Sequence, residues 1–383
     1  MNSKVAKIFF NILMPTLDFK CGSVKNTPYL PIIDNNMLIN NLSQNNIYIA
    51  KSDWNSHETS WGFSTSPLAN NKSLKNAYNF WVEEVNKNFF DLFANEEELN
   101  KIFIEIFDLE SELTPNVRLK DITLLQDELD RKEISNREEE LKLNKTDLPI
   151  KTDVVIKQFL SYAIGCLMGR YRLDKIGLHI AHNNPSPEKR SSYNINGYNF
   201  DIDDDAIIPM MGAESPFSDD IIQRVQQFVL MVWGEDSYTE NLNFINEALG
   251  EDLEKFLTKK FWDFHKKMYK KRPIYWQFAS PKGAFKVLVY MHRMNRFTVQ
   301  KIRQNYLFKQ INYLESEITR LVANEASLNS TEARKLDHFR SNLLECRDYD
   351  LLLKDVADRQ IEFDLDDGVV ENYKLFEGVV SKI

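Results

Sequence analysis

Apolar residues recur at helical spacing along most of the chain. Residues 73–110 carry the thickest apolar stripe, whose large side chains lie three or four positions apart and can face one core. The stripe consists of Phe80, Trp81, Val85, Phe89, Phe90 and Phe93. The same periodicity predicts helices at 152–171, 217–233 and 237–248. Residues 36–49 predict a helix followed by a short apolar strand.

Other segments have the pattern of strands or loops. AIIPMM predicts a strand that ends at Gly212. Arg272-Pro273 breaks helix, so PIYWQF predicts a strand, SPKG a turn, and AFKVLVYM a second strand or a buried helix. Residues 181–205 are expected to form a loop. In the polar segment 51–63 we expect three aromatic residues to pin an extended segment to a neighbouring surface: Trp54, Trp61 and Phe63.

From residue 299 the apolar pattern becomes heptad-like. One run is spaced 4-3-4-3 and a second run 3-4-3, with residues 323–331 between them. This arrangement predicts an antiparallel helical hairpin held by its own apolar seam. The seam residues are Leu307, Ile311, Leu314, Ile318, Leu321, Leu336, Phe339, Leu343 and Cys346.

These patterns together predict an α+β, helix-rich fold. Several small mixed α/β modules would be joined to a helical hairpin that resembles a coiled coil. Gly and Pro are scarce, at 12 each, which favours long helices over an all-β fold. We divide the chain into a wrapping segment, a helical spacer, a mixed α/β domain, and a hairpin with an acidic tail: 1–66, 67–150, 151–298 and 299–383.

One segment concentrates the cations of the chain. Residues 259–309 contain fourteen Lys and Arg, the single acidic residue Asp263, and twelve aromatic residues. The segment has a formal charge of +13, whereas the whole chain is at −9. Such a distribution favours binding of a polyanion, and DNA is the first candidate. The alternative is that the segment docks on the chain's own acidic parts.

Within this segment, the candidate DNA contacts are cations at turn or helical spacings and one ring that can stack on bases. The arginines are favoured for reaching a groove. Trp276 is equally consistent with a core position, because it lies on a predicted strand. The candidates are Lys266, Lys267, Lys270, Lys271, Arg272, Tyr275, Lys282, Arg293, Arg296, Lys301 and Arg303.

Motifs for catalysis are scarce. No Walker loop or nucleophile elbow is present, and the three cysteines have no metal-ligand or redox spacing. Gly165 and Gly169, four residues apart, indicate close helix packing. The aspartate clusters at 203–205 and 364–367 have the oxygen ligands that Mg²⁺ prefers, although such clusters are usually solvated. No signal peptide or membrane-length apolar run is found, so we expect a cytoplasmic protein without membrane contact.

Several strings together resemble one protein family. They include PTLDFKCGSVKNTP, KSDWNSHETSWGF, FLSYAIGCLMGRYRLDKIGLHIAH, KKRPIYWQFASPKGAFKVLVYMHRMNRFTV and IEFDLDDGVVENY. In this order they resemble the C-terminal part of the adenine-specific DNA methyltransferases of BREX phage-defence systems. Type IIG restriction–modification enzymes share the more N-terminal strings. The resemblance runs over nearly the whole chain.

The resemblance implies a target-recognition and helical module that binds double-stranded DNA. The family's S-adenosylmethionine loop and Asn-Pro-Pro-Tyr motif are not found here, so we expect this chain alone to be inactive and to hold no cofactor. A methyltransferase catalytic domain or subunit is the implied partner, with other BREX proteins as further partners. The alternative function is a protein–protein adaptor that acts through the helical hairpin.

Overall fold

The computed structural model describes residues 2–14, 21–34, 36–69, 72–212, 215–323 and 328–383. Its contacts divide the chain into two compact units. Unit 1 is Met1–Ser60 with Tyr78–Val154, and unit 2 is Trp61–Ala77 with Val155–Ile383. The fold is helix-rich α+β with small antiparallel sheets, which confirms the predicted class. The four-part division of the chain stays a prediction.

Unit 1 is built from helices packed around aromatic side chains. In helix α4, Phe89, Phe90 and Phe93 are buried, as its apolar stripe predicts, although Phe80 is exposed. The helices of this unit are α1 (Lys4–Leu13), α2 (Cys21–Lys25), η1 (Pro31–Ile33), α3 (Met37–Asn55), most of α4 (Leu74–Ile106), η2 (Leu119–Asp121), α5 (Arg131–Asn136) and α6 (Glu138–Asn144).

Helix α3 differs from the sequence prediction. It begins after Asn36, whose side chain accepts from the backbone N–H groups of the first turn, and it continues to Asn55. The predicted strand after the helix is therefore wrong. Trp54 lies in the last turn of α3 with 68% of its surface exposed, so it does not pin a loop.

Unit 2 contains a three-stranded antiparallel sheet in the order β3-β5-β4. The strands are β3 (Ile207–Pro209), β4 (Tyr275–Ala279) and β5 (Lys286–Tyr290). Tyr275 pairs with Tyr290 and Ile208 with Leu288. All three strands were predicted, and the second apolar run is a strand, not a helix. Further helices of unit 2 are α7 (Thr152–Leu167), α9 (Ile221–Trp233), α10 (Tyr238–Leu249), α11 (Leu253–Lys255), η3 (Phe256–Lys260), α12 (Phe261–Met268), η4 (Met291–Arg293), η7 (Leu365–Asp367) and α16 (Val369–Lys374).

Strand β4 is covered on both faces. Successive residues of a strand point to opposite sides, so Tyr275 and Trp276 face different neighbours. Tyr275 contacts α7 at Gly165, where a Cβ atom would lie 2.8 Å from the Tyr275 hydroxyl. Trp276 packs on the other side against Phe363 and Phe376. Close packing at Gly165 is therefore confirmed, and Trp276 is a core residue.

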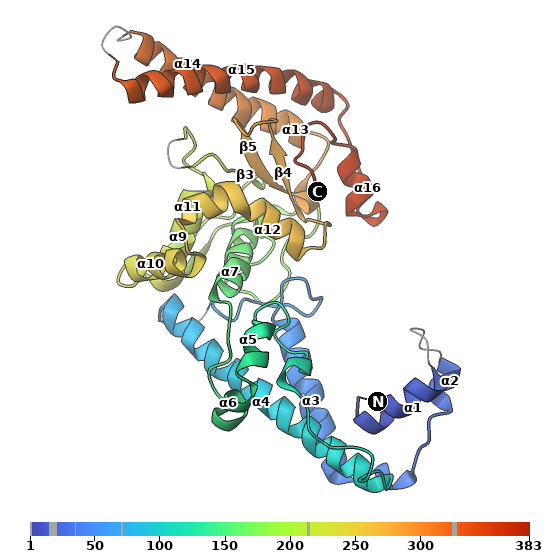
Figure 1. Ribbon diagram of the computed structural model, residues 1–383. Coiled ribbons are helices and arrows are strands. Elements are labelled where there is room, and N and C mark those ends of the chain that lie inside the picture. Colours follow the sequence, from blue (N-terminus) through green and yellow to red (C-terminus); the bar gives the residue numbers. More distant parts are fainter. Residues whose placement is uncertain (1, 15–20, 35, 70–71, 213–214, 324–327) are drawn as a thin grey trace. The chain divides into compact units, whose positions relative to one another are not determined.

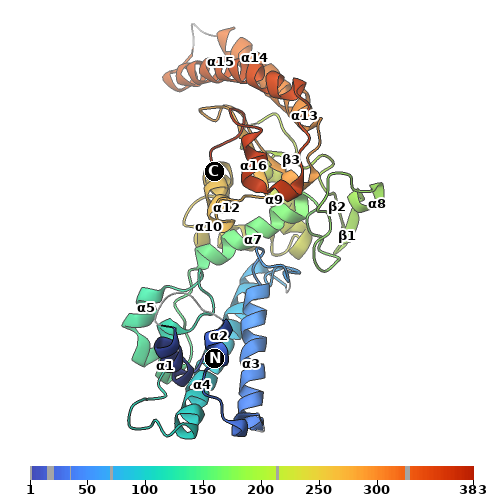
Figure 2. The same ribbon diagram turned by 90° about the vertical axis from the view of Figure 1, so that its right-hand side faces the viewer.

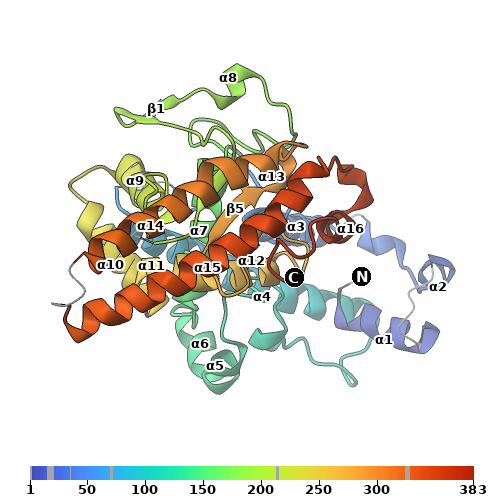
Figure 3. The ribbon, with the colours of Figure 1, turned by 90° about the horizontal axis from the view of Figure 1, so that it is seen from above.

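The segment 181–205 holds a small hairpin that was predicted as a loop. Strands β1 (Tyr193–Ile195) and β2 (Tyr198–Phe200) pair across Asn196-Gly197. Both turn residues have positive φ, 52° and 87°, which suits a two-residue hairpin turn. Figures 2 and 3 show this hairpin and α8 (Pro187–Arg190) projecting from one side of unit 2.

The predicted antiparallel helical hairpin is confirmed. Helices α14 (Phe308–Val322) and α15 (Ser330–Asp358) lie side by side (Figures 1 and 3), and α13 (Thr298–Lys301) and η5 (Ile302–Leu307) lead into them. Arg303 of η5 bonds Asp350, and farther along the chain Tyr313 packs on Phe339, so the partner on α15 moves toward its N-terminus, as antiparallel helices require. Part of the linker, 324–327, lies outside the described residues. Tyr349 of α15 packs on Phe285 beside β5.

Candidate nucleic-acid interface

Several exposed cations of the basic segment lie together where α12 ends. The chain turns there and enters β4 (Figure 1), and we name residues 266–272 the cationic turn. Lys267, Lys270, Lys271 and Arg272 are exposed, and no ion pair of theirs is found among the described residues. Lys266 is half-buried, with its Nζ 2.9 Å from Asp263. The cationic turn thus presents four unpaired positive charges in a net acidic chain.

Buried His265 fixes the base of the cationic turn. Its Nε2 accepts hydrogen bonds from the backbone N–H groups of Ile274 at 3.2 Å and Tyr275 at 3.1 Å. The proton of the ring must then be on Nδ1. Burial lowers the pKa of His265 to about 3, and the charge of Arg170 acts in the same direction. A neutral imidazole therefore joins the end of α12 to the start of β4.

Two of the predicted DNA contacts lie in the interior. Tyr275 is fully buried, with its ring centroid 4.7 Å from that of His265. Arg293 is only 6% exposed, and its guanidinium donates to the carbonyl groups of Met168, Asp203 and Asp204. Neither side chain can reach a phosphate in this conformation. Their burial favours a structural role for both side chains over contact with DNA.

Other predicted contacts face the chain's own acidic residues. Arg303 makes two hydrogen bonds to Asp350 on α15, at 2.6 and 3.1 Å. Arg296 lies 3.6 Å from Glu362. The alternative that the segment docks on the chain's own acidic parts therefore explains these two arginines.

The two remaining predicted contacts keep exposed side chains. The backbone N–H of Lys282 donates to Glu345 at 2.7 Å, while its side chain extends into solvent. Lys301 is also exposed. The assignment of Lys266, Lys267, Lys270, Lys271, Arg272, Lys282 and Lys301 to DNA stays a prediction.

A polar cavity of about 500 Å³ lies elsewhere in unit 2. Asp203 and Asp205 both accept a hydrogen bond from the backbone N–H of Ile207, so the two carboxylates are close together. Burial and the neighbouring Asp205 raise the pKa of Asp203 to about 7. Within the described ranges, no three His, Cys, Asp or Glu side chains are arranged to hold a metal ion. The lining residues include Arg190, Asp201, Asp203, Asp204, Asp219, Arg224 and Gln227.

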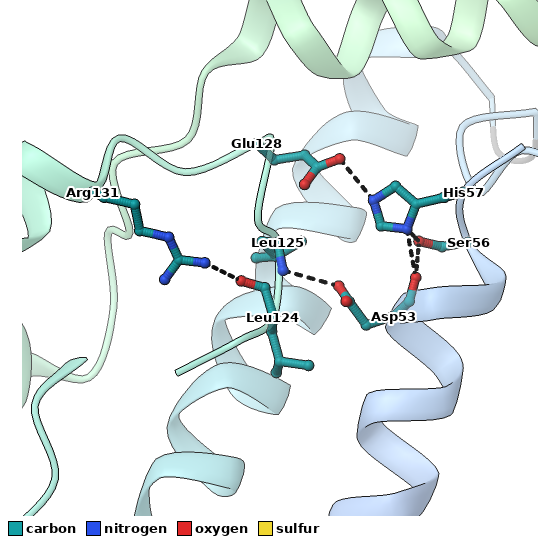
Figure 4. A network of polar contacts seen from close by, with 7 residues as sticks. All are labelled: Asp53, Ser56, His57, Leu124, Leu125, Glu128 and Arg131. Carbon is teal, nitrogen blue, oxygen red and sulfur yellow. Dashed lines mark hydrogen bonds and ion pairs between the residues drawn. The ribbon is translucent and has the colours of Figure 1, made fainter. Parts of the chain in front are cut away.

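Unit 1 contains a buried ion pair that was not predicted from the sequence (Figure 4). His57 Nε2 lies 2.8 Å from Glu128, whose side chain is 1% exposed. His57 Nδ1 lies 2.8 Å from the carbonyl oxygen of Asp53, and Asp53 accepts the N–H of Leu125. Burial opposes protonation of the ring, but Glu128 and Asp53 outweigh it and raise the pKa of His57 to about 9. Glu128 lies 71 residues from His57, so no local spacing in the sequence pointed to this pair.

This network superficially resembles a catalytic triad, because Ser56 Oγ lies 3.4 Å from His57 Nδ1. The chemistry differs. A histidine with a pKa of about 9 is protonated at neutral pH and cannot accept the serine proton. Ser56 Oγ instead donates to the carbonyl oxygen of Asp53 at 2.7 Å. The cluster is therefore a structural clamp between α3 and the segment that carries Glu128.

Comparison with known proteins identifies similar chains, although no protein-family model matches. The whole chain is 36% identical to the adenine-specific methyltransferase BrxX of Escherichia coli O9:H4 (strain HS). Over 97% of its length it is 33% identical to the adenine-specific methyltransferase PglX of Lacticaseibacillus casei (strain Zhang). The chain spans 32% and 30% of the lengths of these relatives. Which third of a relative it matches stays a prediction. No described helix has the length and hydropathy needed to cross a membrane.

Proposed function

We propose that this chain is a DNA-binding recognition module of a BREX-type adenine-specific methyltransferase, and that the cationic turn holds the backbone of double-stranded DNA. The observation that carries the proposal is the set of exposed cations Lys267, Lys270, Lys271 and Arg272, which no acidic side chain of the described residues neutralises. The named activity of the two relatives supports it, since a methyltransferase acting on adenine must hold nucleic acid.

The electrostatics of unit 2 favour the cationic turn over Arg296 and Arg303. Arg303 is held by Asp350 and Arg296 lies near Glu362, so a phosphate would have to compete with a carboxylate at either arginine. At the cationic turn a phosphate displaces only water and counterions, and the release of counterions from DNA drives binding. Positioning on the DNA is thus assigned to the end of α12.

The chemistry of methyl transfer is assigned to another polypeptide segment or subunit. The sequence contains neither the S-adenosylmethionine loop nor the Asn-Pro-Pro-Tyr motif of the family it resembles. We propose that S-adenosylmethionine is held by a methyltransferase catalytic domain or subunit, which this chain accompanies and directs to a DNA site. Other BREX defence proteins are further candidate partners.

Reversing three charges of the cationic turn is expected to abolish most DNA binding. The triple variant Lys267→Glu/Lys271→Glu/Arg272→Glu removes three cations and adds three anions. Each lost phosphate contact should lower the slope of log affinity against log salt by about 0.9. Fluorescence anisotropy with a labelled duplex of mixed sequence, between about 50 and 200 mM salt, measures both the affinity and the slope.

The matched control makes the same charge change on exposed lysines of unit 1, with Lys87→Glu/Lys101→Glu/Lys132→Glu. It should keep the parent salt slope. Equal losses in the two triple variants would mean that net charge, not the cationic turn, governs binding. Absence of binding by the parent chain at low salt would refute the proposed function.

A second candidate function is an adaptor that binds another defence protein through the helical hairpin. The observation in its favour is apolar surface on α15: Leu344, Leu351 and Leu352 are 64%, 67% and 46% exposed. Solvent-exposed leucines that recur along one helix are typical of helix-docking surfaces.

If the hairpin is an adaptor, Leu344→Glu/Leu351→Glu should lose a protein partner that co-purifies after nuclease treatment, while DNA affinity stays unchanged. Pull-down of tagged parent and variant chains from the native host, followed by mass spectrometry, makes the comparison. Identical recovery of partners by both chains would exclude this surface.

A further inference from the structure

The cationic turn contains an unusual backbone. Lys270 and Lys271 have φ angles of +50° and +62°, so two consecutive residues with side chains adopt the left-handed conformation. Glycine is the usual residue at such positions, because a Cβ atom is strained there. The strain is local and separate from the charge of the two side chains.

The turn has the hydrogen bonding of a Schellman helix ending. The N–H of Lys270 donates to the carbonyl of Lys267, and the N–H of Lys271 donates to the carbonyl of Lys266. Lys270 therefore occupies the position that glycine fills most often. The N–H of Arg272 also donates within the turn, to Tyr269. With these backbone donors engaged, an anion at the turn must be bound by side chains.

Packing does not explain the lysines. The side chains of Lys270 and Lys271 are exposed, so replacing them with glycine would remove little buried surface. The negative end of the α12 dipole favours cations at this end of the helix, but Lys266 and Lys267 already supply two. A dipole interaction also needs no left-handed residue. What the two lysines add is positive charge on a backbone whose conformation is fixed.

The surrounding structure holds the strained conformation in place. His265 accepts from the N–H groups of Ile274 and Tyr275, just beyond the turn. Trp276 Nε1 donates to the carbonyl oxygen of Pro273 at 3.0 Å. Because both ends of the turn are fixed in the core, the strain at Lys270 and Lys271 cannot relax without disturbing α12 or β4.

We propose that the cationic turn is a preorganised phosphate-binding loop, in which Lys270 and Lys271 each hold a phosphate of the nucleic-acid backbone. This inference rests on the proposed function and adds the two contact residues and their fixed geometry. Preorganisation of the backbone favours binding because less loop entropy is lost when the phosphates arrive.

The double variant Lys270→Gly/Lys271→Gly relieves the backbone strain and removes both positive charges, which affect stability and DNA affinity separately. The thermal midpoint should stay unchanged or rise, because glycine relieves the left-handed strain. Loss of two phosphate contacts should lower the salt slope by about 2 and the affinity by about 100-fold at about 50 mM salt. Differential scanning fluorimetry and anisotropy with a labelled duplex of mixed sequence provide the two measurements.

Two further variants keep the interpretation unambiguous. Lys270→Arg/Lys271→Arg retains both charges and should retain the salt slope. Lys270→Asn/Lys271→Asn removes the charges but keeps residues that tolerate the left-handed backbone, so it should bind DNA as weakly as the glycine variant. Parent-like binding by the glycine or asparagine variant would overturn the inference, and so would a lowered thermal midpoint with glycine. Failure of the parent chain itself to bind would instead refute the proposed function.

Discussion

Replacing Arg293 with alanine is expected to lower the free energy of unfolding of unit 2 by about 3 to 5 kcal/mol. The guanidinium donates to Met168 at 3.1 Å, and to Asp203 and Asp204 at 2.6 Å each. Alanine would leave these carbonyl groups without their charged donor and would open a cavity at a residue that is 6% exposed. Hydrogen exchange of the amides in β4 and β5 measures the loss within unit 2.

The neighbouring Arg296 provides the control for this experiment. Its side chain is 52% exposed and lies 3.6 Å from Glu362, so Arg296→Ala should change the free energy of unfolding by less than about 1 kcal/mol. Equal effects of the two substitutions would contradict the structural role of Arg293. A charge reversal at Arg293 is consequently unsuitable as a probe of DNA binding, because it would unfold the region that surrounds it.

Unit 1 is expected to lose about 3 kcal/mol of stability as the pH rises from about 6.5 to about 9. The pKa of His57 is raised above its unfolded value, so the stabilisation is fully present below about pH 6.5 and disappears as the folded histidine loses its proton. The cause is Glu128, whose buried carboxylate lies 2.8 Å from Nε2. NMR titration of the His57 ring should give a midpoint near pH 9.

The variant Glu128→Gln tests the cause of this pH dependence. Glutamine keeps the size and a hydrogen-bond acceptor but carries no charge, so the pKa of His57 should fall toward neutrality and the stability should vary much less above pH 6.5. Hydrogen exchange at the Leu125 amide, which donates to Asp53, reports on the same region. A His57 midpoint near pH 6.5 in the parent chain would contradict the buried ion pair.

Local periodicity was sufficient to predict much of the fold. Helix α4, the strands on either side of SPKG and the hairpin of α14 and α15 follow from patterns of side chains close in sequence, and these elements were confirmed. The β1–β2 hairpin was missed because its strands are short and polar, although Asn196-Gly197 is a strong signal for a two-residue turn. The end of α3 was missed because an apolar run at its centre favoured a strand.

The sequence alone could not predict which Lys and Arg side chains are buried, paired with carboxylates or exposed. The total of +13 says nothing about which charges are neutralised by carboxylates far along the chain. Asp350 lies 47 residues from Arg303, and only the folding of α15 brings them together. Burial also depends on the tertiary fold, because Arg293 is buried whereas Arg296, only three residues later, is exposed. The order of residues alone could not separate structural arginines from free lysines.

The division of the chain into units has a practical consequence for exchanging parts of it. Unit 2 takes residues 61–77 from within the sequence of unit 1, and the boundaries after residues 77 and 154 fall inside α4 and α7. No single cut in the gene can release either unit intact. A chimera that transplants unit 2 must carry two separate coding segments and join them within continuous helices, where the register of each junction has to be preserved.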